Sequence, residues 1–516
     1  MSAPGNSRQP RKTVVSGHMD RFTGHHPNNA QIARFLQLSG CRVINVRRAS
    51  SSIRLEPWQL VVRLPKALEE EFGFSRELLM VVTGWLDFRV KDLESIRTVV
   101  AATDRVEPEI AILVCDDPDA SDKAFEWLGN DFTLIAVTHQ ALKLAAKSDS
   151  EASVAALRSA LQAGLFGRNF YDESGPVSGE RFFGRSNTLT QIRSDFANHR
   201  TVGLFGLRKI GKTSILQQSI QRAEASDIAI YIDLGGERIH RDSRHILATF
   251  LDRISTTYPD IELPSLRWED GADRFTTAII EWLDRQLGRF DQEGRRMILA
   301  LDEIEAILPT ADREGLPYWE EVLAALRSLW QGHQSFQIAF AGVNPSIFEL
   351  PSVGDRDNPV FAFVRPTYVQ CMSRPEFDRM VVQLGKRTGV SWHSDILDRL
   401  YSETGGHPYL SRQVCAHVVA GVELPAMIPY DLLDDRLAEF ALLRSDVFNE
   451  IFDSLRRHFP EELKALQRIV RSGGRAAQEM RSTELRHLLG YELVTLQRGI
   501  VRPRVGLIEA WLKARS

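Results

Sequence analysis

Long apolar runs and paired cysteines are both missing from this sequence. No stretch approaches the roughly 18 consecutive apolar residues that a membrane-spanning helix needs, and residues 1–11 lack the apolar segment of a secretory signal. The four cysteines are far apart and form no C-x-x-C pair, which argues against a zinc knuckle or a disulfide framework and favours reduced core thiols. These absences predict a cytoplasmic protein without a membrane partner.

A strong charge of one sign is absent as well. The formal net charge is −4 at pH 7, so the whole chain has no general attraction to nucleic acid. The balance is uneven, however, because 13 Lys and Arg stand against 6 Glu and no Asp from Ser454 onward. This basic end could contact phosphate backbones or present a solvated face, and charge alone does not separate the two.

The most informative feature that is present is a complete G-x-x-x-x-G-K-[ST] pattern. It reads Gly206-Leu207-Arg208-Lys209-Ile210-Gly211-Lys212-Thr213-Ser214, after an apolar strand-like run and before a helix-like segment. Glycines let backbone N–H groups and the helix N-terminus face a phosphate. Lys212 would then reach the β- and γ-phosphates and Thr213 would hold Mg²⁺. A glycine-rich turn with a surface lysine is the alternative, but the flanking signals favour binding of ATP or GTP.

An acidic pair follows a later strand. Asp302 and Glu303 come directly after the apolar run 297–301, which is typical of a strand buried on both faces. Such a pair is costly there without a cation. We therefore expect Asp302 to hold Mg²⁺ through water alongside Thr213, and Glu303 to orient or deprotonate the attacking water. An acidic helix cap is the alternative.

The alternation of strands and helices between Phe182 and Thr367 predicts an α/β domain with a parallel sheet covered on both faces. Its ligand should lie at the carboxyl ends of the strands. Asn344 lies just beyond the strand 336–341, where its amide could contact the γ-phosphate or the lytic water. Asn before Pro is also an ordinary turn.

Composition and pattern also predict the domain organisation. We expect a disordered tail at 1–28, a small α/β domain at 29–146, a linker at 147–180, a phosphate-loop domain at 181–370, a helical lid at 371–430 and a winged-helix domain at 431–516. Within the linker, 153–163 is alanine-rich and could be helical.

Five ordered motifs carry a family resemblance. They are Phe183-Gly184-Arg185, the phosphate loop, Leu-Asp-Glu-Ile-Glu at 301–305, Ala-Gly-Val-Asn-Pro at 341–345 and Gly-Gly-His-Pro-Tyr-Leu at 405–410. Together they resemble the STAND and archaeal-type P-loop ATPases, and they are similar to the origin-recognition branch of AAA+ proteins. The resemblance covers roughly residues 180 to 516.

The resemblance implies roles for residues outside the phosphate loop. It places the backbone of 183–185 near the adenine, with Pro408 packed over it from the lid and His407 as a phosphate sensor. A helix-terminal histidine is the alternative for His407. The lid lacks the family's Gly-Asp-x-Arg arginine, for which Arg412 is a substitute candidate. No arginine finger can be assigned, although Arg356 and Arg365 lie in a plausible region after Asn344, and this implies slow hydrolysis unless a partner supplies a finger.

The C-terminal residues fit a winged helix, with helices at 463–471, 482–489 and 507–512 and β-like runs at 493–497 and 500–503. Its arginines could touch double-stranded DNA; these are Arg481, Arg486, Arg498, Arg502 and Arg504. Winged helices in switch ATPases also pack on the nucleotide domain as a latch, so both readings stay open.

The N-terminal domain is the least informative part of the sequence. Its strand and helix order could fit a reduced nuclease-like fold, and Lys66, Glu69 and Asp87 are candidates for metal-dependent cleavage. In this domain, an Asp followed by a Glu-x-Lys at the end of a later strand is absent, so no two-carboxylate and lysine site is assembled. We therefore expect a sensing or docking module.

These expectations combine into a leading hypothesis of an ATP- and Mg²⁺-dependent switch. ATP binding would close the lid, and slow hydrolysis would reopen it, controlling homo-oligomer assembly, a protein partner or DNA engagement. The resemblance also implies a role in prokaryotic defence or signalling. A DNA-binding loader ATPase and a nuclease effector acting through the N-terminal domain are the alternatives.

Overall fold

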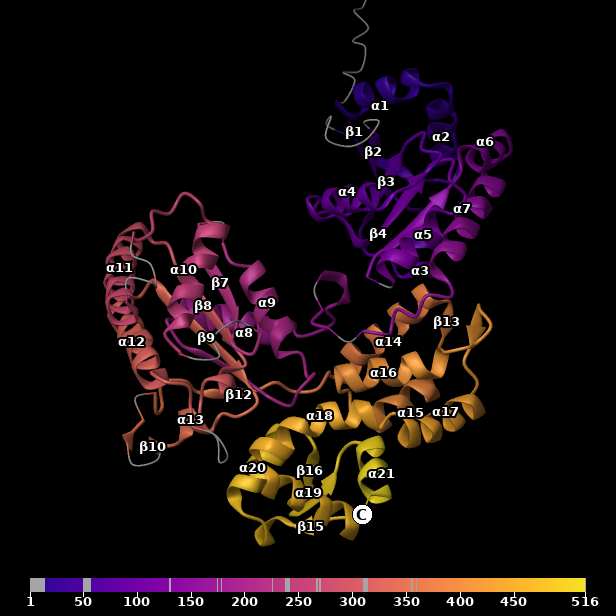
Figure 1. Cartoon of the computed structure of the whole chain (residues 1–516). Helices are drawn as coiled ribbons and strands as arrows, with labels where there is room; N and C mark the ends of the chain where they lie inside the picture. Colours follow the sequence, from indigo (N-terminus) through magenta and orange to yellow (C-terminus); the bar gives the residue numbers. More distant parts are fainter. Residues whose placement is uncertain are drawn as a thin grey trace, which may run out of the picture. The chain divides into compact units, whose positions relative to one another are not determined.

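The computed structural model describes residues 14–49, 57–129, 131–173, 175–177, 179–224, 226–236, 242–265, 268, 271–309, 314–353, 356–358 and 360–515 (Figure 1). Across these ranges, no helix is both long and apolar enough to cross a membrane. Contacts divide the chain into two compact units. Unit 1 comprises Met1–Asp172, Arg379–Ser394 and Cys415–Leu432, and unit 2 comprises Glu173–Asp378, Asp395–Val414 and Leu433–Ser516.

Unit 1 is built on a five-stranded sheet in the order β1-β2-β3-β4-β5. Strands β1 to β3 are antiparallel neighbours, whereas β3, β4 and β5 are parallel and need the crossover helices α4 and α5. The strands are β1 (Arg42–Arg48), β2 (Trp58–Arg63), β3 (Glu77–Val82), β4 (Val106–Val114) and β5 (Thr133–Val137), and β13 (Val390–Ser391) pairs separately with β14 (Ala426–Met427). The helices are α1 (Val14–His25), α2 (Pro27–Leu38), α3 (Lys66–Phe72), α4 (Val90–Ala101), α5 (Ala120–Leu128), α6 (His139–Lys147) and α7 (Ser150–Leu165).

Helices cover both faces of this sheet. On β3, Leu78, Met80 and Val82 belong to one buried cluster together with side chains of α2 and α7. Leu79 and Val81 belong to a second cluster with side chains of α4 and α5. The strand period of two thus sends alternate residues into two cores.

The prediction that residues 1–28 are disordered is wrong for residues 14–28, which contain helix α1 and the start of helix α2. Helix α1 buries Phe22, whose ring meets the Trp58 ring edge-on at 5.4 Å. The polar composition of this segment indicated disorder. One amphipathic face with few large apolar residues is nevertheless enough to dock a helix on a sheet. Residues 1–13 lie outside the described residues.

The prediction of a linker at 147–180 is also wrong for residues 150–165, which form helix α7. This helix has 16 residues and places Leu157, Leu161 and Leu165 in the core of unit 1. The alanine-rich stretch is therefore part of the folded domain rather than a connection between domains.

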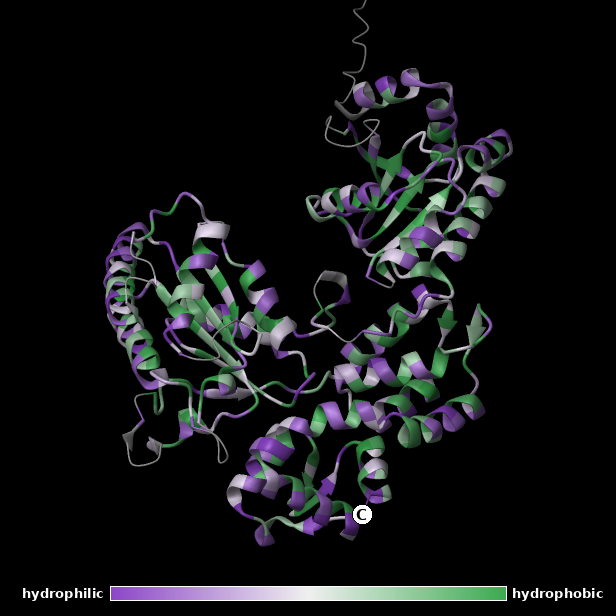
Figure 2. Ribbon diagram, in the orientation of Figure 1, coloured by the Kyte–Doolittle hydropathy of each residue, from purple (hydrophilic) through white to green (hydrophobic). Residues whose placement is uncertain are grey.

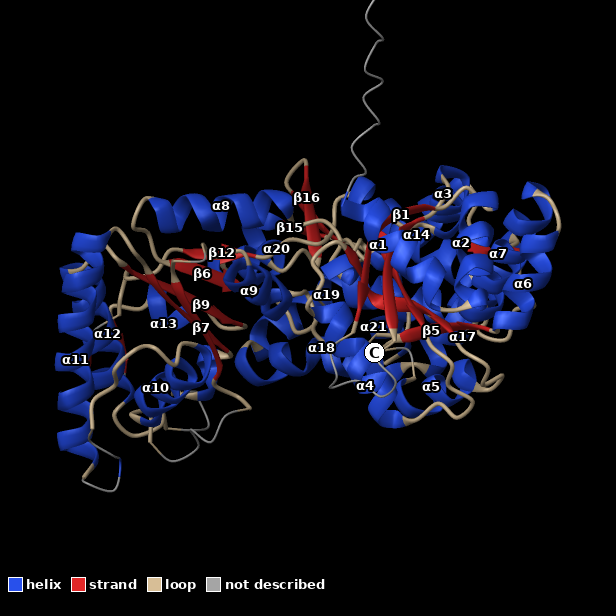
Figure 3. Cartoon of the chain, turned by 90° about the horizontal axis from the view of Figure 1, so that it is seen from above, coloured by secondary structure: helices blue, strands red, loops and turns tan. Residues whose placement is uncertain are grey.

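Unit 2 contains a second five-stranded sheet, in the order β12-β6-β9-β8-β7, with every neighbouring pair parallel. Strand β9 separates β6, which leads into the phosphate loop, from β8, which ends at Asp302. Strands β12, β6, β9 and β7 of this sheet are labelled in Figure 3. The strands are β6 (Val202–Phe205), β7 (Ile228–Asp233), β8 (Met297–Asp302), β9 (Phe336–Gly342) and β12 (Pro366–Tyr368).

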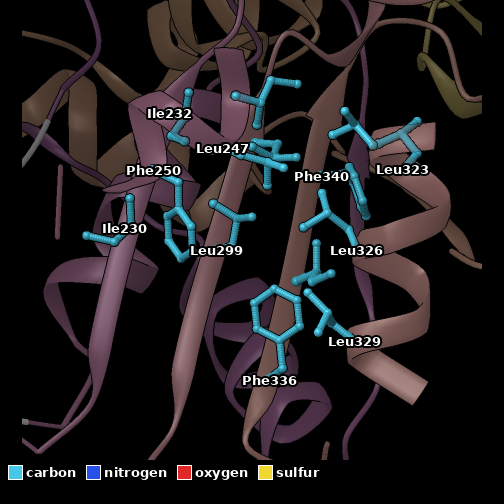
Figure 4. Close-up of a cluster of buried hydrophobic side chains, with 14 of the residues drawn as sticks. Ile230, Ile232, Leu247, Phe250, Leu299, Leu323, Leu326, Leu329, Phe336 and Phe340 are labelled. Carbon is cyan, nitrogen blue, oxygen red and sulfur yellow. The ribbon is translucent and has the colours of Figure 1, made fainter. Parts of the chain in front are cut away.

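This sheet too is buried on both faces, as the sequence predicts. Met297, Leu299 and Leu301 of β8 join a cluster with helices α10 (His245–Thr257), α11 (Ala272–Glu293) and α12 (Trp319–Gly332) (Figure 4). Ile298 and Ala300 join another with α8 (Ser186–Ala197) and α9 (Lys212–Gln221). The strands are accordingly apolar along their length (Figure 2).

The remaining elements of unit 2 are mostly helical. They include η1 (Gly179–Arg181), η3 (Ile304–Ala306), α13 (Ser346–Glu349), β10 (Ser352–Val353), β11 (Arg356–Asp357), α15 (Ser394–Thr404), α17 (Tyr430–Leu443) and α18 (Ser445–His458). Helices α14 (Arg374–Thr388) and α16 (Pro408–Val419) each cross the boundary between the two units, and α17 also begins in unit 1 and continues in unit 2 from Leu433. The expected lid at 371–430 is therefore divided between both units rather than forming a domain of its own.

The C-terminal elements follow the order expected of a winged helix. They are α19 (Pro460–Ser472), β15 (Arg475–Ala476), η4 (Ala477–Glu479), α20 (Ser482–Gly490), β16 (Val494–Gln497), β17 (Ile500–Pro503) and α21 (Gly506–Ala514). Strands β16 and β17 form an antiparallel hairpin, which turns at Arg498 and Gly499, and β15 pairs with β17. Both turn residues have positive φ, as a tight hairpin requires.

Candidate functional site

The phosphate loop lies between β6 and α9 and opens onto a cavity of about 480 Å³. Gly211 caps α9 with φ of 100°, a conformation that favours glycine and lets the loop turn sharply into the helix. The first N–H groups of a helix have no partner within that helix, so an anion is stabilised at this end. A cavity of this size fits a small-molecule ligand.

Lys212 places its cation inside the loop. Its Nζ donates to the carbonyl oxygens of Gly206 at 3.0 Å and Leu207 at 2.9 Å, and the side chain is almost completely buried. Burial lowers the pKa of Lys212, while the carboxylates of Glu305 and Asp302 act in the opposite direction. The ammonium is thus held where incoming phosphate oxygens can replace two carbonyl acceptors.

Asp302 lies at the end of β8, buried and held from three sides. Its Oδ2 accepts from the Thr213 hydroxyl at 2.6 Å and from the Tyr231 hydroxyl at 3.1 Å, and its Oδ1 accepts from the Glu303 backbone N–H at 2.9 Å. The structure therefore brings Asp302 and Thr213 together, as the sequence predicts. Tyr231 was not anticipated, because a tyrosine within an apolar strand carries no motif.

The oxygen donors at this point fit a hard divalent cation. Among the residues with described positions, no three His, Cys, Asp or Glu side chains gather closely enough to hold a metal by themselves. Mg²⁺ is commonly held by one or two protein oxygens, completed by water and substrate phosphates. Thr213 and Asp302 suit that mode of binding.

Glu303 extends from a strained backbone position, with φ of 53°. Burial raises the pKa of its carboxyl group, and the charges of Asp233 and Asp302 add to the rise. Asp233 ends the neighbouring strand β7 and accepts N–H bonds from Gly235 and Gly236 at 3.0 and 3.2 Å. A side chain at Gly235 would collide with the Glu303 carboxylate, so the glycine leaves room for it.

A further carboxylate, Glu305, lines the cavity beside Lys212. Its Oε2 accepts from the Val343 backbone N–H at 3.1 Å, and burial raises its pKa. Val343 lines the cavity, whereas the described cavity wall does not include the next residue, Asn344. Instead, Asn344 Oδ1 accepts from the Ser346 N–H at 2.9 Å, which makes it a turn residue at the start of α13.

The segment 183–185 is close to the loop without lining the cavity wall that the structure describes. Arg185 is buried, and its guanidinium donates to the Ile210 carbonyl at 3.1 Å and to the Gln370 carbonyl. Its backbone N–H donates to Glu376 at 2.8 Å, and a side chain at Gly184 would collide with that glutamate. Arg185 therefore braces the back of the phosphate loop.

The N-terminus of α16 supplies another wall of the cavity through Pro408, Tyr409 and Arg412. His407 precedes it and is buried, with Nδ1 accepting the Leu410 N–H at 3.3 Å. Burial lowers the pKa of His407 to about 3, so the ring is neutral and carries its proton on Nε2. His407 is thus a helix-capping residue at the edge of the site.

Arg412 is one turn further along α16 and is also buried. Its guanidinium donates to the Arg181 carbonyl at 2.8 Å and lies 5.9 Å from the centroid of the Phe183 ring. Because Arg412 lines the cavity, it remains the candidate for the cationic residue on the lid side. Arg365, in the region plausible for an arginine finger, directly precedes β12 and lines a separate groove.

The remaining loop cations pair with helix α18. Arg208 lies 3.2 Å from Asp453, and Lys209 lies 3.0 Å from Glu450. The Tyr409 hydroxyl donates to the same glutamate at 2.7 Å. No sequence signal identified these carboxylates, because they lie more than 200 residues from the loop and belong to an ordinary amphipathic helix.

The cavity wall is rich in charge of both signs. Its described residues include the carboxylates of Glu173, Asp233, Asp302, Glu303, Glu305 and Glu450, and the cations of Arg208, Lys209, Lys212 and Arg412. Six formal negative charges against four positive ones disfavour a bare polyanion. A nucleotide would therefore enter most favourably with a divalent cation.

The arginines expected to contact DNA are in unequal situations. Arg504 is paired with Glu492, and Arg486 donates to Glu349 at 2.7 Å. Arg481 lies 3.9 Å from Glu484 and is otherwise exposed. Arg498 and Arg502 are exposed on the β16–β17 hairpin, and neither is in an ion pair with a described residue.

The candidate nuclease residues of unit 1 do not converge. Lys66 and Glu69 lie on α3, where Lys66 pairs with Glu70 at 3.4 Å. Asp87 follows β3 and pairs with Arg89 at 2.9 Å. These surface pairs make no site for metal-dependent cleavage.

The parallel sheet and its loop decide the fold. Unit 2 has a P-loop NTPase fold. No family model and no curated protein matches the chain. Among solved structures, the Walker-type ATPase of Pyrococcus abyssi is similar at 14% identity and a TM-score of 0.49, covering 67% of this chain and 99% of that one.

Two more solved structures are similar at this level. The ORC2 protein of Aeropyrum pernix, in its ADPNP–ADP complexes, has 15% identity and a TM-score of 0.41, covering 68% of this chain and 99% of its own. The RuvB Holliday junction branch migration motor of Thermotoga maritima has 13% identity and a TM-score of 0.35, covering 64% of this chain and 95% of its own.

Proposed function

We propose that this protein is an ATP-dependent switch that hydrolyses ATP slowly. The observation that supports it most is the 2.6 Å bond between Thr213 and Asp302 at the mouth of the phosphate loop, with Lys212 held inside the loop. These three side chains supply the phosphate contact and the metal-binding oxygens that P-loop ATPases need.

In this proposal, Lys212 exchanges its carbonyl acceptors for the β- and γ-phosphates. Bound Mg²⁺ would supply positive charge to the same phosphates, held by Thr213 and by Asp302. Glu303, which lines the cavity directly after Asp302, orients the attacking water and accepts its proton. No arginine finger is assigned, so turnover is slow without a partner.

Two substitutions test the assignment. Lys212→Ala removes the phosphate contact and should abolish ATP binding, as measured by calorimetry. Glu303→Gln should keep ATP binding but lower turnover by roughly 100-fold or more, because it removes the proton acceptor. Equal turnover in wild type and Glu303→Gln would transfer the role of base to Glu305. Absence of ATP binding by the folded wild type would overturn the function itself.

The exposed hairpin arginines favour a second candidate function, a DNA-binding loader ATPase. Arg498 and Arg502 are presented on the wing, where phosphate backbones could be contacted. Assembly into homo-oligomers or with a protein partner belongs to the same proposal. A role in prokaryotic defence has the sequence resemblance as its support.

A further inference from the structure

Helix α18 presents two carboxylates to the phosphate loop. Glu450 and Asp453 are three residues apart and so lie on the same side of the helix. They pair with Lys209 at 3.0 Å and with Arg208 at 3.2 Å, respectively. The two basic residues at the x positions of the phosphate-loop motif, Arg208 and Lys209, are thereby paired with one helix from a distant part of the sequence.

The other side of α18 is packed into the C-terminal core. Its Phe448 and Phe452 rings stack on Trp511 of α21, with centroids 5.2 and 5.4 Å apart. Phe448 also meets Phe440 of α17 edge-on at 5.9 Å. A displacement of α18 from the phosphate loop would therefore be transmitted to the winged-helix elements.

The Glu450 carboxylate is ionised at neutral pH. Burial opposes this, but hydrogen bonds from Tyr409 and Lys209 outweigh it and lower the pKa of Glu450. Glu450 also lines the cavity that contains Lys212 and Thr213. A nucleotide phosphate would consequently meet a fixed negative charge beside the loop cations that it needs.

Phosphate and α18 thus compete for the same cations. Arg208 and Lys209 cannot satisfy phosphate oxygens and the two carboxylates equally, and the like charges of phosphate and carboxylate repel each other. Coupling of this kind is reciprocal, since whatever weakens the helix contact when ATP binds must also weaken ATP binding when the contact forms.

We propose that Glu450 and Asp453 form an electrostatic latch, which holds α18 on the phosphate loop and is released by binding of a nucleoside triphosphate. The latch rests on the proposed function, since it regulates the same nucleotide site. Binding of the nucleotide at the phosphate loop would thereby allow the C-terminal elements that pack on α18 to move.

The test compares the wild type with a Glu450→Gln, Asp453→Asn double variant of the full chain. Affinity for a fluorescent ATP analogue with Mg²⁺ should rise about three- to tenfold in the variant, as expected for two partly exposed ion pairs. High salt should reduce this difference, because it screens the pairs. A Glu461→Gln, Glu479→Gln variant removes two exposed charges from the C-terminal elements and should match the wild type.

A second measurement follows α18 directly. Hydrogen exchange of its backbone amides in the wild type should become faster when the ATP analogue binds, whereas the double variant should exchange fast with or without it. Equal or weaker analogue binding by the double variant would overturn the latch and leave the switch intact. Failure of every form to bind the analogue would overturn the proposed function as well.

Discussion

The hydroxyl groups of Tyr231 and Thr213 bond the same oxygen of Asp302. A carboxylate fixed in this way presents its other lone pairs in a defined direction, which matters for a metal held by few protein ligands. At the scale of single residues, the site is therefore a set of oriented oxygens rather than a mere accumulation of charge.

Removing the Tyr231 hydroxyl should loosen that orientation. In Tyr231→Phe the ring still packs, but we expect the Mg²⁺ concentration for half-maximal ATP hydrolysis to rise by roughly 10-fold, as for other outer partners of metal ligands. Tyr258→Phe is the matched control, since its hydroxyl accepts the Ala229 N–H away from the cavity. An unchanged Mg²⁺ requirement in Tyr231→Phe would show that Thr213 alone orients Asp302.

Sequence reasoning found part of the site, whereas Asn344 and the segment 183–185, which also belong to contiguous motifs, lie outside the described cavity wall. Lys212, Thr213 and Asp302 come together as predicted, because a phosphate loop and a following acidic strand end lie at the same edge of a parallel sheet. Asp233 and Glu305 line the same cavity without having been predicted. Each is one carboxylate among many in the sequence, and only the fold places Asp233 at the end of β7 and Glu305 in η3 beside the loop.

At the scale of elements, helix α14 carries an unusual contact within unit 1. Arg387 and Glu107 are both almost fully buried and form an ion pair at 2.9 Å. The same guanidinium lies 5.5 Å from the centroid of the Phe74 ring, and Glu107 also accepts the Ser75 N–H at 3.1 Å. The C-terminal part of α14 is thereby bonded to the N-terminal α/β fold.

Breaking this buried pair should be costly. Arg387→Met leaves a buried carboxylate uncompensated. We therefore expect the free energy of unfolding of unit 1 to fall by about 3–5 kcal/mol, as measured by hydrogen exchange across a denaturant titration. Adding Glu107→Met should restore part of the loss, because neither charge then remains. Lys66→Ala, which breaks an exposed pair, serves as the control and should leave unit 1 nearly unchanged. A small effect of Arg387→Met would show that water reaches the pair.

The same element scale explains the errors in the expected domain plan. Helices α1 and α7 are part of the unit 1 core, although their sequences suggested a disordered tail and a linker. Short amphipathic helices gain their stability from the surface on which they pack rather than from their own propensity. A sequence pattern does not reveal that surface.

At the scale of the whole molecule, the basic C-terminal region is a candidate for DNA binding. Its arginines differ, since Arg504 is committed to Glu492 whereas Arg498 and Arg502 point to solvent from the wing. Sequence counting treated all of them as equal. The structure instead ranks them by the partners that each already has.

Duplex binding should depend on the wing and on salt. If the winged helix binds DNA, replacing Arg498 and Arg502 by Ala should weaken binding, measured by fluorescence anisotropy, and reduce the dependence of affinity on salt concentration. Arg486→Ala is the comparison, because that side chain is already paired with Glu349 and should matter less. Salt-independent binding, or none with ATP present, would remove the DNA-binding role.

The amino-acid sequence by itself determined the phosphate loop, the acidic strand end and the alternation that makes a parallel sheet, because these depend on neighbouring residues and on the period of each element. Only the tertiary structure decided that Glu450 and Asp453 hold the loop cations, that Tyr231 orients Asp302 and that α14 is bonded to the N-terminal fold. These contacts join side chains far apart in the chain, whose energies depend on burial and distance and are therefore set only when the chain has folded.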